Sequence, residues 1–392
     1  MSNLSKKPMI LITCDYYLPG FESGGAMRTI VNMTDRLGDE FDFKIITRDH
    51  DGPLNRTPYR GVRVGEWNAV GNADVYYLDA SDVRMSSLRR LVRETAPAAI
   101  YVNSFFSPLT IFVLMLRRLR RIRATPVILA PEGEFSPGAL SLKSVKKKLY
   151  IRAAKLLHLL KGVVWKAGSE PERRDIENVI GKRLDILVAP NMPPVMINEP
   201  YSQADKPEKA VGSANMVFLS RFMRKKNFNW LLRHLLEING ELSIDICGPV
   251  EDADYWIETQ EIIKTLPPNI AIALKGPVPH DQVAATLMKY HFFILPTLGE
   301  NFGHVFIEAL AAGCPLVISN RTPWRDLEEK AIGWDLPLED PDEWLATIEK
   351  CIQMPQLDFT NLSQHSRQFA KEWLTDPDLE ESNRNVIRAA LR

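Results

Sequence analysis

Short apolar runs alternate with amphipathic helical patterns along most of this 392-residue chain, and this alternation constrains the fold most strongly. In the first half, the runs that predict buried strands are Met9–Cys14, Phe43–Ile46, Ala99–Val102, Val127–Ala130, Gly162–Trp165 and Ile186–Ala189. Helical periodicity, as in Gly25–Leu37, occurs between them. Strands that alternate with helices predict a parallel sheet with right-handed crossovers.

The same alternation begins again after a polar stretch at 196–213. Expected strands are Met216–Ser220, Leu242–Cys247, Ile270–Leu274, His291–Leu295 and Pro315–Ser319, and expected helices are Asn227–Ile238, Asp252–Thr265, Val283–Tyr290 and His304–Ala312, the last closed by Gly313. A chain of this length predicts two domains. We therefore predict an α/β protein with two Rossmann-like doubly wound domains, at 1–195 and 214–375. A linker spans 196–213, and a C-terminal helix at 376–392 could cross back to the first domain. Ligands are expected in an interdomain cleft, beyond the carboxyl ends of the strands.

The charged residues balance over the whole chain but not within its halves. Lys+Arg and Asp+Glu number 49 each, which argues against a general nucleic-acid binder. Residues 1–200 carry a net charge of +9 and the remainder −9, and the segment from Arg84 to Lys161 holds 16 basic and 3 acidic residues. This excess indicates either an anionic partner, such as a phosphate or a membrane surface, or simply solvated helix faces.

The cysteines and the apolar segments bear on location. Cys14, Cys247, Cys314 and Cys351 are widely spaced, lack a zinc pattern and are expected to be buried and reduced. The N-terminus reads as a first strand rather than a signal peptide, and the lipid-like run Leu109–Leu116 is too short to span a bilayer. We expect a cytoplasmic protein that could also work at the inner face of the membrane.

One segment carries most of the chemistry: PTLGENFGHVFIEALAAG, beginning at Pro296, which predicts a strand end, a loop and a helix. Backbone amides at the start of such a helix, together with the helix dipole, form an anion site, and a glycine lets a ligand approach closely. Glu300 and Glu308 lie eight positions apart, so both can face one ligand, Glu308 on a ribose diol and Glu300 on a sugar. The alternative is a purely structural role, in which the segment forms a capped core helix and both acids are solvated. The amides expected to serve the anion belong to Phe302, Gly303, His304 and Val305.

This segment resembles the E-x7-E signature of family-four retaining glycosyltransferases of the bacterial polysaccharide type, which adopt the GT-B fold. FLSRFMRKKNFNWLL resembles the family's diphosphate clamp, which would place Arg221 and Lys226 as the cations beside the catalytic Glu300. Two cations from a loop after a strand can stabilise a departing diphosphate without a metal. The resemblance also implies donor-binding roles for Gly24, Gly25, Gly248, Gly276, Pro277, Val278, Asn301 and Glu308.

The first half departs from the family pattern in two loops. IYVNSFFSPLT lacks the histidine that many members carry, and Asn103 and Ser104 occupy the loop instead. APEGEFSPGAL has Glu132 where an arginine often stands, and Glu134 follows as a further acceptor candidate. Basic residues of this half could meet lipid headgroups or the diphosphate of a lipid-linked acceptor, or could form a solvated face. They are Arg117, Arg118, Arg120, Arg121, Arg123, Lys143, Lys146, Lys147 and Lys148.

The resemblance implies front-face transfer of a sugar from a nucleotide diphosphate sugar to a glycan or lipid-linked acceptor, with no cofactor and no metal. Asp252-Ala253-Asp254 comes nearest to a metal-binding pattern, but its place at a helix start favours capping. Two alternatives stay open. One is a catalytically impaired sugar-nucleotide-binding partner of another transferase, and the other is a different GT-B enzyme, such as an epimerase or a phosphorylase.

Overall fold

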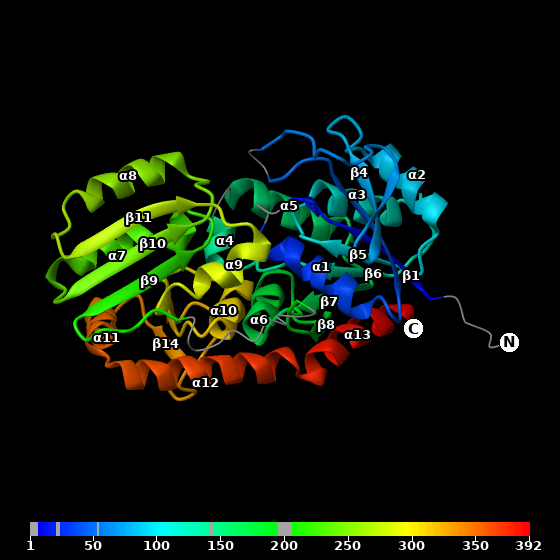
Figure 1. Cartoon of the computed structure of the whole chain (residues 1–392). Helices are drawn as coiled ribbons and strands as arrows, with labels where there is room; N and C mark the ends of the chain where they lie inside the picture. The colour runs from blue at the N-terminus through cyan, green and yellow to red at the C-terminus, as the bar shows by residue number, and fades with distance from the viewer. Residues whose placement is uncertain (1–6, 21–23, 53–54, 142–143, 195–205) are drawn as a thin grey trace. The chain divides into compact units, whose positions relative to one another are not determined.

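The computed structural model describes residues 7–20, 24–52, 55–141, 144–194 and 206–392. The chain forms two compact units (Figure 1). Unit 1 comprises Met1–Val195 together with Pro377–Arg392, and unit 2 comprises Met196–Asp376. Much of the predicted linker lies outside the described residues, so its extent stays a prediction.

Unit 1 contains an eight-stranded sheet in the order β3-β4-β2-β1-β5-β6-β7-β8. Neighbouring strands are parallel, as predicted, except that β3 pairs antiparallel with β4 across the Gly71–Asn72 turn. The prediction missed both of these strands, since β3 is half exposed at the sheet edge and lacks an apolar run. The strands are β1 Met9–Thr13, β2 Asp42–Arg48, β3 Trp67–Val70, β4 Ala73–Leu78, β5 Ala99–Asn103, β6 Val127–Ala130, β7 Val163–Ala167 and β8 Asp185–Val188.

Helices cover this sheet with their apolar faces. They are α1 Gly25–Leu37, α2 Met85–Thr95, α3 Pro108–Arg118, α4 Pro137–Ser141, α5 Ser144–Leu156, α6 Glu170–Val179 and α13 Pro377–Leu391. The lipid-like run lies in α3, where Leu109, Val113 and Leu114 join the core of unit 1. Helix α13 buries Val386 and Ile387 in the same unit. No helix among the described residues is both long and apolar enough to cross a membrane.

Unit 2 contains a six-stranded, fully parallel sheet in the order β11-β10-β9-β12-β13-β14. Its strands are β9 Ser213–Leu219, β10 Glu241–Cys247, β11 Ile270–Gly276, β12 Phe292–Leu295, β13 Leu316–Ser319 and β14 Gly333–Leu336, the last of which was not predicted. Its helices are α7 Phe228–His234, α8 Ala253–Ile263, α9 His280–Leu287, α10 His304–Ala311, α11 Pro341–Gln353 and α12 Gln356–Leu374. The helix expected over 227–238 is instead α7 between two short 3₁₀ turns, Arg224–Lys226 and Leu235–Glu237.

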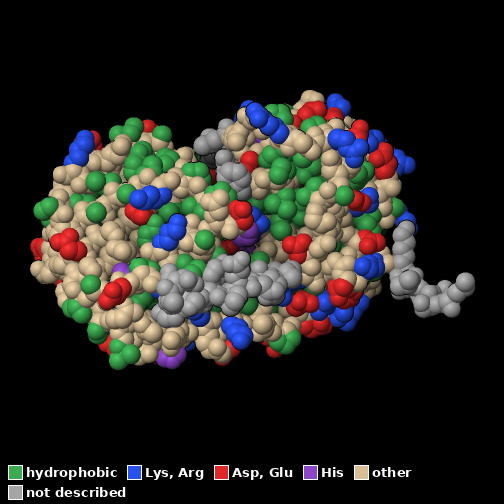
Figure 2. Space-filling model, viewed as in Figure 1, with side chains coloured by type: hydrophobic (Ala, Val, Ile, Leu, Met, Phe, Trp, Pro, Cys, Tyr) green, Lys and Arg blue, Asp and Glu red, His purple; other side chains and the backbone are tan. Residues whose placement is uncertain are grey.

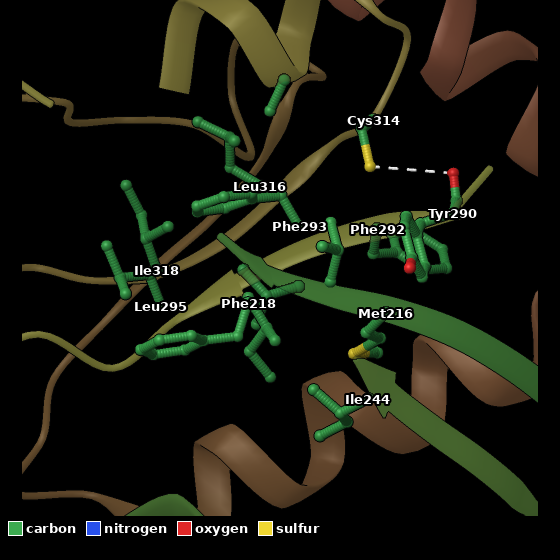
Figure 3. Close-up of a cluster of buried hydrophobic side chains, with 14 of the residues drawn as sticks. Met216, Phe218, Ile244, Tyr290, Phe292, Phe293, Leu295, Cys314, Leu316 and Ile318 are labelled. Carbon is green, nitrogen blue, oxygen red and sulfur yellow. Dashed lines mark hydrogen bonds between the residues drawn. The ribbon is translucent and has the colours of Figure 1, made fainter. Parts of the chain in front are cut away.

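The core of unit 2 forms where the central strands meet. Figure 3 shows Met216 and Phe218 of β9 beside Phe293 of β12 and Leu316 of β13. Cys314 donates a hydrogen bond to the Tyr290 carbonyl at 3.7 Å, and all four cysteines are free and buried, as predicted. Residues this tightly enclosed hold the strands in register, and with them the loops that follow each strand.

Two local predictions in unit 2 are confirmed. Asp252 caps α8 by accepting a hydrogen bond from the Tyr255 amide at 2.9 Å. Gly313 has a φ of 67°, and its amide donates to Leu310 while that of Cys314 donates to Ala309. These bonds form a Schellman motif, which needs a left-handed residue and so explains the glycine.

Candidate functional site

The sheet order of unit 2 locates the site. From β9 the chain adds β10 and β11 on one side, whereas β12, β13 and β14 extend the other side. The order therefore reverses between β9 and β12, and in open α/β sheets ligands bind beyond the carboxyl ends of the strands at such a point. The loop after β9 carries Arg221 and Lys226, and the loop after β12 carries Glu300.

An ion pair between Lys226 Nζ and Glu300 Oε1 joins these two loops. Their side chains are only 9% and 14% exposed, and the Leu298 amide also donates to the Lys225 carbonyl at 2.9 Å. Burial acts to raise the pKa of Glu300, but Lys226, Lys225 and Arg221 together lower it below its ordinary value. Glu300 is therefore an ionised carboxylate held beside cations.

Arg221 has a partner that the sequence analysis did not single out. Its Nη1 lies 3.2 and 3.3 Å from the two carboxylate oxygens of Glu251, in the loop after β10. The nearby Arg224 pairs with Glu258 of α8 instead. Glu251 therefore holds the Arg221 guanidinium by an ion pair. The only signal for it in the sequence is an acid three residues beyond Gly248.

Two predicted glycines shape the loops beside this pair. Gly248 has a φ of 148°, and a Cβ atom there would lie 1.9 Å from the Ser220 carbonyl oxygen. Its amide donates to the Gly276 carbonyl at 2.8 Å. Gly276 has a φ of 82° and open space around it, so its backbone conformation alone favours glycine. Of the residues that follow, Pro277 is exposed and Val278 packs against the core of unit 2.

Helix α10 begins at the reversal point without a side-chain cap. Gly303 is its N-cap, with a φ of 80°, and a Cβ there would lie 2.5 Å from the Phe306 ring. His304 and Val305 form the first turn, next to Asn301 and Phe302. The Phe302 ring is buried, and the Phe302 carbonyl accepts a 2.6 Å hydrogen bond from the Trp324 indole. The Phe302 ring therefore belongs to the core, and a role of its backbone amide at the site stays a prediction.

Glu308 lies one turn into α10, and its carboxylate is largely buried. Its Oε1 is 3.9 Å from Nδ1 of His280, the first residue of α9. His280 was not among the predicted site residues. The structure brings it to Glu308 because the loop after β11 ends there, two residues beyond Val278.

The strand order of unit 1 reverses between β1 and β5, and Asn103 and the Gly24–Gly25 pair lie there. Gly24 is the N-cap of α1, with a φ of 70°, and Gly25 is the first helical residue. Asn103 is buried, and its Nδ2 donates to the Ala26 carbonyl at 3.4 Å. Asn103 therefore ties the two loops together, and a contact with acceptor stays a prediction.

Hydrogen bonds to Glu134 hold the loop after β5 in unit 1. Ser104, with a φ of 81°, donates to Glu134 Oε1 at 2.7 Å, and the Phe105 and Phe106 amides donate to Oε2. Burial raises the pKa of Glu134 to about 7. Glu134 thus orders the loop after β5, and its acceptor role stays a prediction.

This shift predicts a pH dependence of stability. Because the folded-state pKa of Glu134 lies above 4.5, the folded state binds its proton more strongly than the unfolded state does. Protonation of Glu134 stabilises the folded state fully below pH 4.5, and this stabilisation is lost as the pH rises towards about 7. The free energy of unfolding should fall by up to about 3 kcal/mol over this range. Glu134→Gln retains the hydrogen-bonding shape and should flatten this part of the profile in urea unfolding between pH 5 and 8. Glu170→Gln, at the exposed start of α6, should leave the wild-type slope, and an equally steep slope in Glu134→Gln would contradict the assignment.

Glu132 lies in a buried polar cluster. Its Oε2 accepts from Asn191 at 3.0 Å, and Asn191 in turn accepts from the buried Lys166 at 2.6 Å. Glu172 accepts hydrogen bonds from the Gly133 and Gly168 amides, and burial together with Glu132 raises its pKa. The cluster supports the loop after β6. Glu172 was not among the predicted site residues.

Charged side chains of both signs lie on the visible surface. In Figure 2, acidic and basic side chains are interspersed across the face shown. Among the predicted basic residues, Lys143 lies outside the described residues. Arg117 and Arg118 donate to backbone carbonyls of Lys161, Gly162 and Leu157.

Comparison with known proteins agrees with this geometry. Residues 202–373 match the family model described as glycosyl transferases group 1. A relative named as the GtfA subunit of a UDP-N-acetylglucosamine–peptide N-acetylglucosaminyltransferase from Streptococcus agalactiae is 26% identical over 162 residues, which is 39% of this chain and 31% of the relative. A 2-deoxystreptamine N-acetyl-D-glucosaminyltransferase from Niallia circulans is 28% identical over 113 residues, 28% of each chain. The chain thus spans about a third of the length of these curated relatives.

Solved structures extend the likeness over both units. Anabaena HepE in complex with UDP and glucose has a TM-score of 0.72 at 13% identity and covers 97% of this chain and 100% of its own. Sucrose-phosphate synthase from Thermosynechococcus elongatus has a TM-score of 0.74 at 15% identity and covers 98% of this chain and 99% of its own. The predicted GT-B fold, with two Rossmann-like units, is therefore confirmed. Residues 202–373 thus resemble the group 1 glycosyl transferases, and the solved structures show the fold of both units.

Proposed function

We propose that the chain is a retaining glycosyltransferase that transfers a sugar from a nucleotide diphosphate sugar to a glycan or lipid-linked acceptor. The observation that carries this proposal is the buried Lys226–Glu300 pair between the loops after β9 and β12. A cation and an ionised carboxylate at this point match the needs of a diphosphate and an adjoining sugar.

Different residues would bind different parts of the donor. Arg221 and Lys226 would hold the diphosphate, the uncapped start of α10 would add backbone amides, and Glu300 would accept hydrogen bonds from the sugar. Glu308 would accept from the ribose diol, with His280 beside it. In the absence of donor, Arg221 is paired with Glu251 and Lys226 with Glu300. A diphosphate would therefore compete with these carboxylates for the two cations.

The chemistry is a front-face substitution. The acceptor oxygen forms a bond to the anomeric carbon on the face from which the diphosphate departs. The bond from that carbon to the diphosphate oxygen breaks, and the acceptor proton passes to the departing phosphate. The negative charge that grows on the phosphate is stabilised by Arg221 and Lys226, so the reaction needs no metal ion.

A UDP-sugar is the donor proposed first. The names of the two relatives described above refer to UDP-N-acetylglucosamine or to N-acetylglucosaminyl transfer, and HepE binds UDP and glucose. UDP-N-acetylglucosamine and UDP-glucose therefore head the panel, with GDP-mannose as the contrasting base.

Calorimetric titration with this panel, in EDTA and in magnesium, tests the proposal. We expect saturable binding of one donor in both buffers, followed by slow donor hydrolysis or by transfer. Glu300→Gln should retain nucleotide binding but lower turnover by about 10²–10³. Glu329→Gln, an exposed acid in unit 2, is the matched control and should behave as wild type. A chain that binds donor but neither hydrolyses nor transfers it would favour the impaired-partner alternative, and no donor binding at all would refute both.

A further inference from the structure

Helix α5 of unit 1 presents large apolar side chains to solvent. Val145 is 79% exposed, Leu149 68% and Leu156 79%. These residues lie at spacings of four and seven positions, which places them on one stripe of the helix. The opposite side of α5, with Ile151 and Ala154, packs in the core of unit 1. Burial against the sheet therefore does not account for the exposed stripe.

Basic side chains flank the stripe on both sides. At 100° per residue, Lys148, Arg152 and Lys155 lie along one edge and Lys146 along the other, and all four are exposed. The sequence from Ser144 to Lys161 contains six basic residues and no acidic one. This arrangement is unlike an ordinary solvated helix, in which charges of both signs usually occupy the exposed face.

The end of α3 extends this surface. Arg118 Nε donates to the Leu157 carbonyl at 2.9 Å, and Arg117 donates to the Lys161 and Gly162 carbonyls at 2.8 Å. These bonds satisfy carbonyls just beyond the end of α5 and hold the two helix ends together. Leu119 and Leu157, both exposed, lie next to this junction. The α5 surface thus comprises the exposed apolar residues Leu119, Val145, Leu149, Leu156 and Leu157, with the basic residues around them.

We propose that the α5 surface docks the protein on an anionic lipid bilayer. An apolar stripe bordered by lysine and arginine suits the boundary between acyl chains and headgroups, where the stripe is buried and the cations meet lipid phosphates. The absence of acidic residues along this segment leaves no repulsion from a negative surface. The inference is independent of the proposed transferase activity, because it rests on a surface and not on the donor site.

Flotation of the full chain with vesicles tests this proposal. We expect binding to vesicles of phosphatidylglycerol and phosphatidylcholine in equal parts, and at least about tenfold weaker binding to phosphatidylcholine alone, since each basic residue near an anionic surface adds about fivefold. Binding should weaken as salt shortens the Debye length from about 10 Å at 0.1 M to about 3 Å at 1 M.

Two sets of variants separate the apolar and the charged contributions. Val145→Ser with Leu149→Ser and Leu156→Ser should lower the partition coefficient by about tenfold or more, because apolar burial is lost. The matched control is Leu236→Ser with Ile257→Ser and Leu357→Ser, which changes three exposed apolar residues of unit 2. Lys146→Glu with Lys148→Glu and Arg152→Glu should reduce binding at least as much, whereas Arg174→Glu with Lys182→Glu and Arg183→Glu changes the net charge equally elsewhere in unit 1.

The outcomes are distinct. Thermal unfolding and nucleotide titration should match wild type in every variant, since all the altered residues are exposed. The proposal would be overturned if the wild-type protein did not bind anionic vesicles. It would also be overturned if the α5-surface variants bound them as well as wild type does. A dimer that the serine variant dissociates would overturn it too, if vesicles are not bound, because a second copy would then cover the surface. Failure of donor binding alone would leave this inference standing.

Discussion

Lys226→Ala is expected to lower turnover by about 10²–10³, because it removes a preorganised cation from the departing diphosphate. The same change leaves the Glu300 carboxylate largely buried without its ion-pair partner. Removing one partner of a buried pair costs about 3–5 kcal/mol, so the free energy of unfolding should fall as well. Steady-state kinetics and urea unfolding measure the two effects separately.

A double-mutant cycle distinguishes a site role from a purely structural one. Lys226→Met with Glu300→Gln removes both charges and should recover much of the stability that Lys226→Met alone loses. Turnover should not recover, since neither group then serves the donor. Lys371→Ala, an exposed lysine of α12, is the control and should leave turnover unchanged because it lies outside the loops after β9 and β12. Full activity in Lys226→Ala would remove Lys226 from the diphosphate site.

Gly248→Ala is the second substitution with a large expected effect. Its Cβ would meet the Ser220 carbonyl oxygen at 1.9 Å, and its φ of 148° is strained for any residue with a side chain. Strain and overpacking together should cost on the order of 3–5 kcal/mol. The clash acts on the backbone that leads directly into Arg221, so donor affinity should fall together with stability.

Gly276→Ala is a matched control for this effect. Its φ of 82° is also positive, but nothing lies within 4 Å of the added Cβ. The cost should therefore be about 1–2 kcal/mol from backbone strain alone. Thermal unfolding and nucleotide titration of both variants test the difference. Equal losses would show that backbone conformation, rather than the close approach of two loops, requires glycine at 248.

Strands with continuous apolar runs were predictable because a strand buried on both faces excludes polar residues. The runs at β1, β5 and β12 illustrate this, since their side chains are almost fully buried. The half-exposed β3 carries no such signal, and β14 combines Gly333 with Asp335 and was also missed. The helix over 227–238 was predicted too long, because apolar spacing does not distinguish α from 3₁₀ geometry over three residues.

Within the site, residues of a single segment were predictable and their partners from other segments were not. Glu300, Gly303 and Glu308 lie in one strand–loop–helix unit, so spacing alone indicates that they share an edge. Glu251 and His280 reach Arg221 and Glu308 from the loops after β10 and β11. No local pattern links those segments, because strand order decides which loops are neighbours.

Local sequence patterns are enough to predict the two-unit α/β architecture, the charged and glycine residues of the β12–α10 loop, and the basic character of α5. These properties follow from periodicity, composition and turn chemistry, which are local. Three other features emerge only from the packing of the folded chain: Lys226 pairs with Glu300, Glu134 is buried beneath the loop after β5, and the apolar stripe of α5 faces solvent. Those outcomes depend on which strands are adjacent and which helix face meets the sheet, and both are set by packing between residues far apart in the chain.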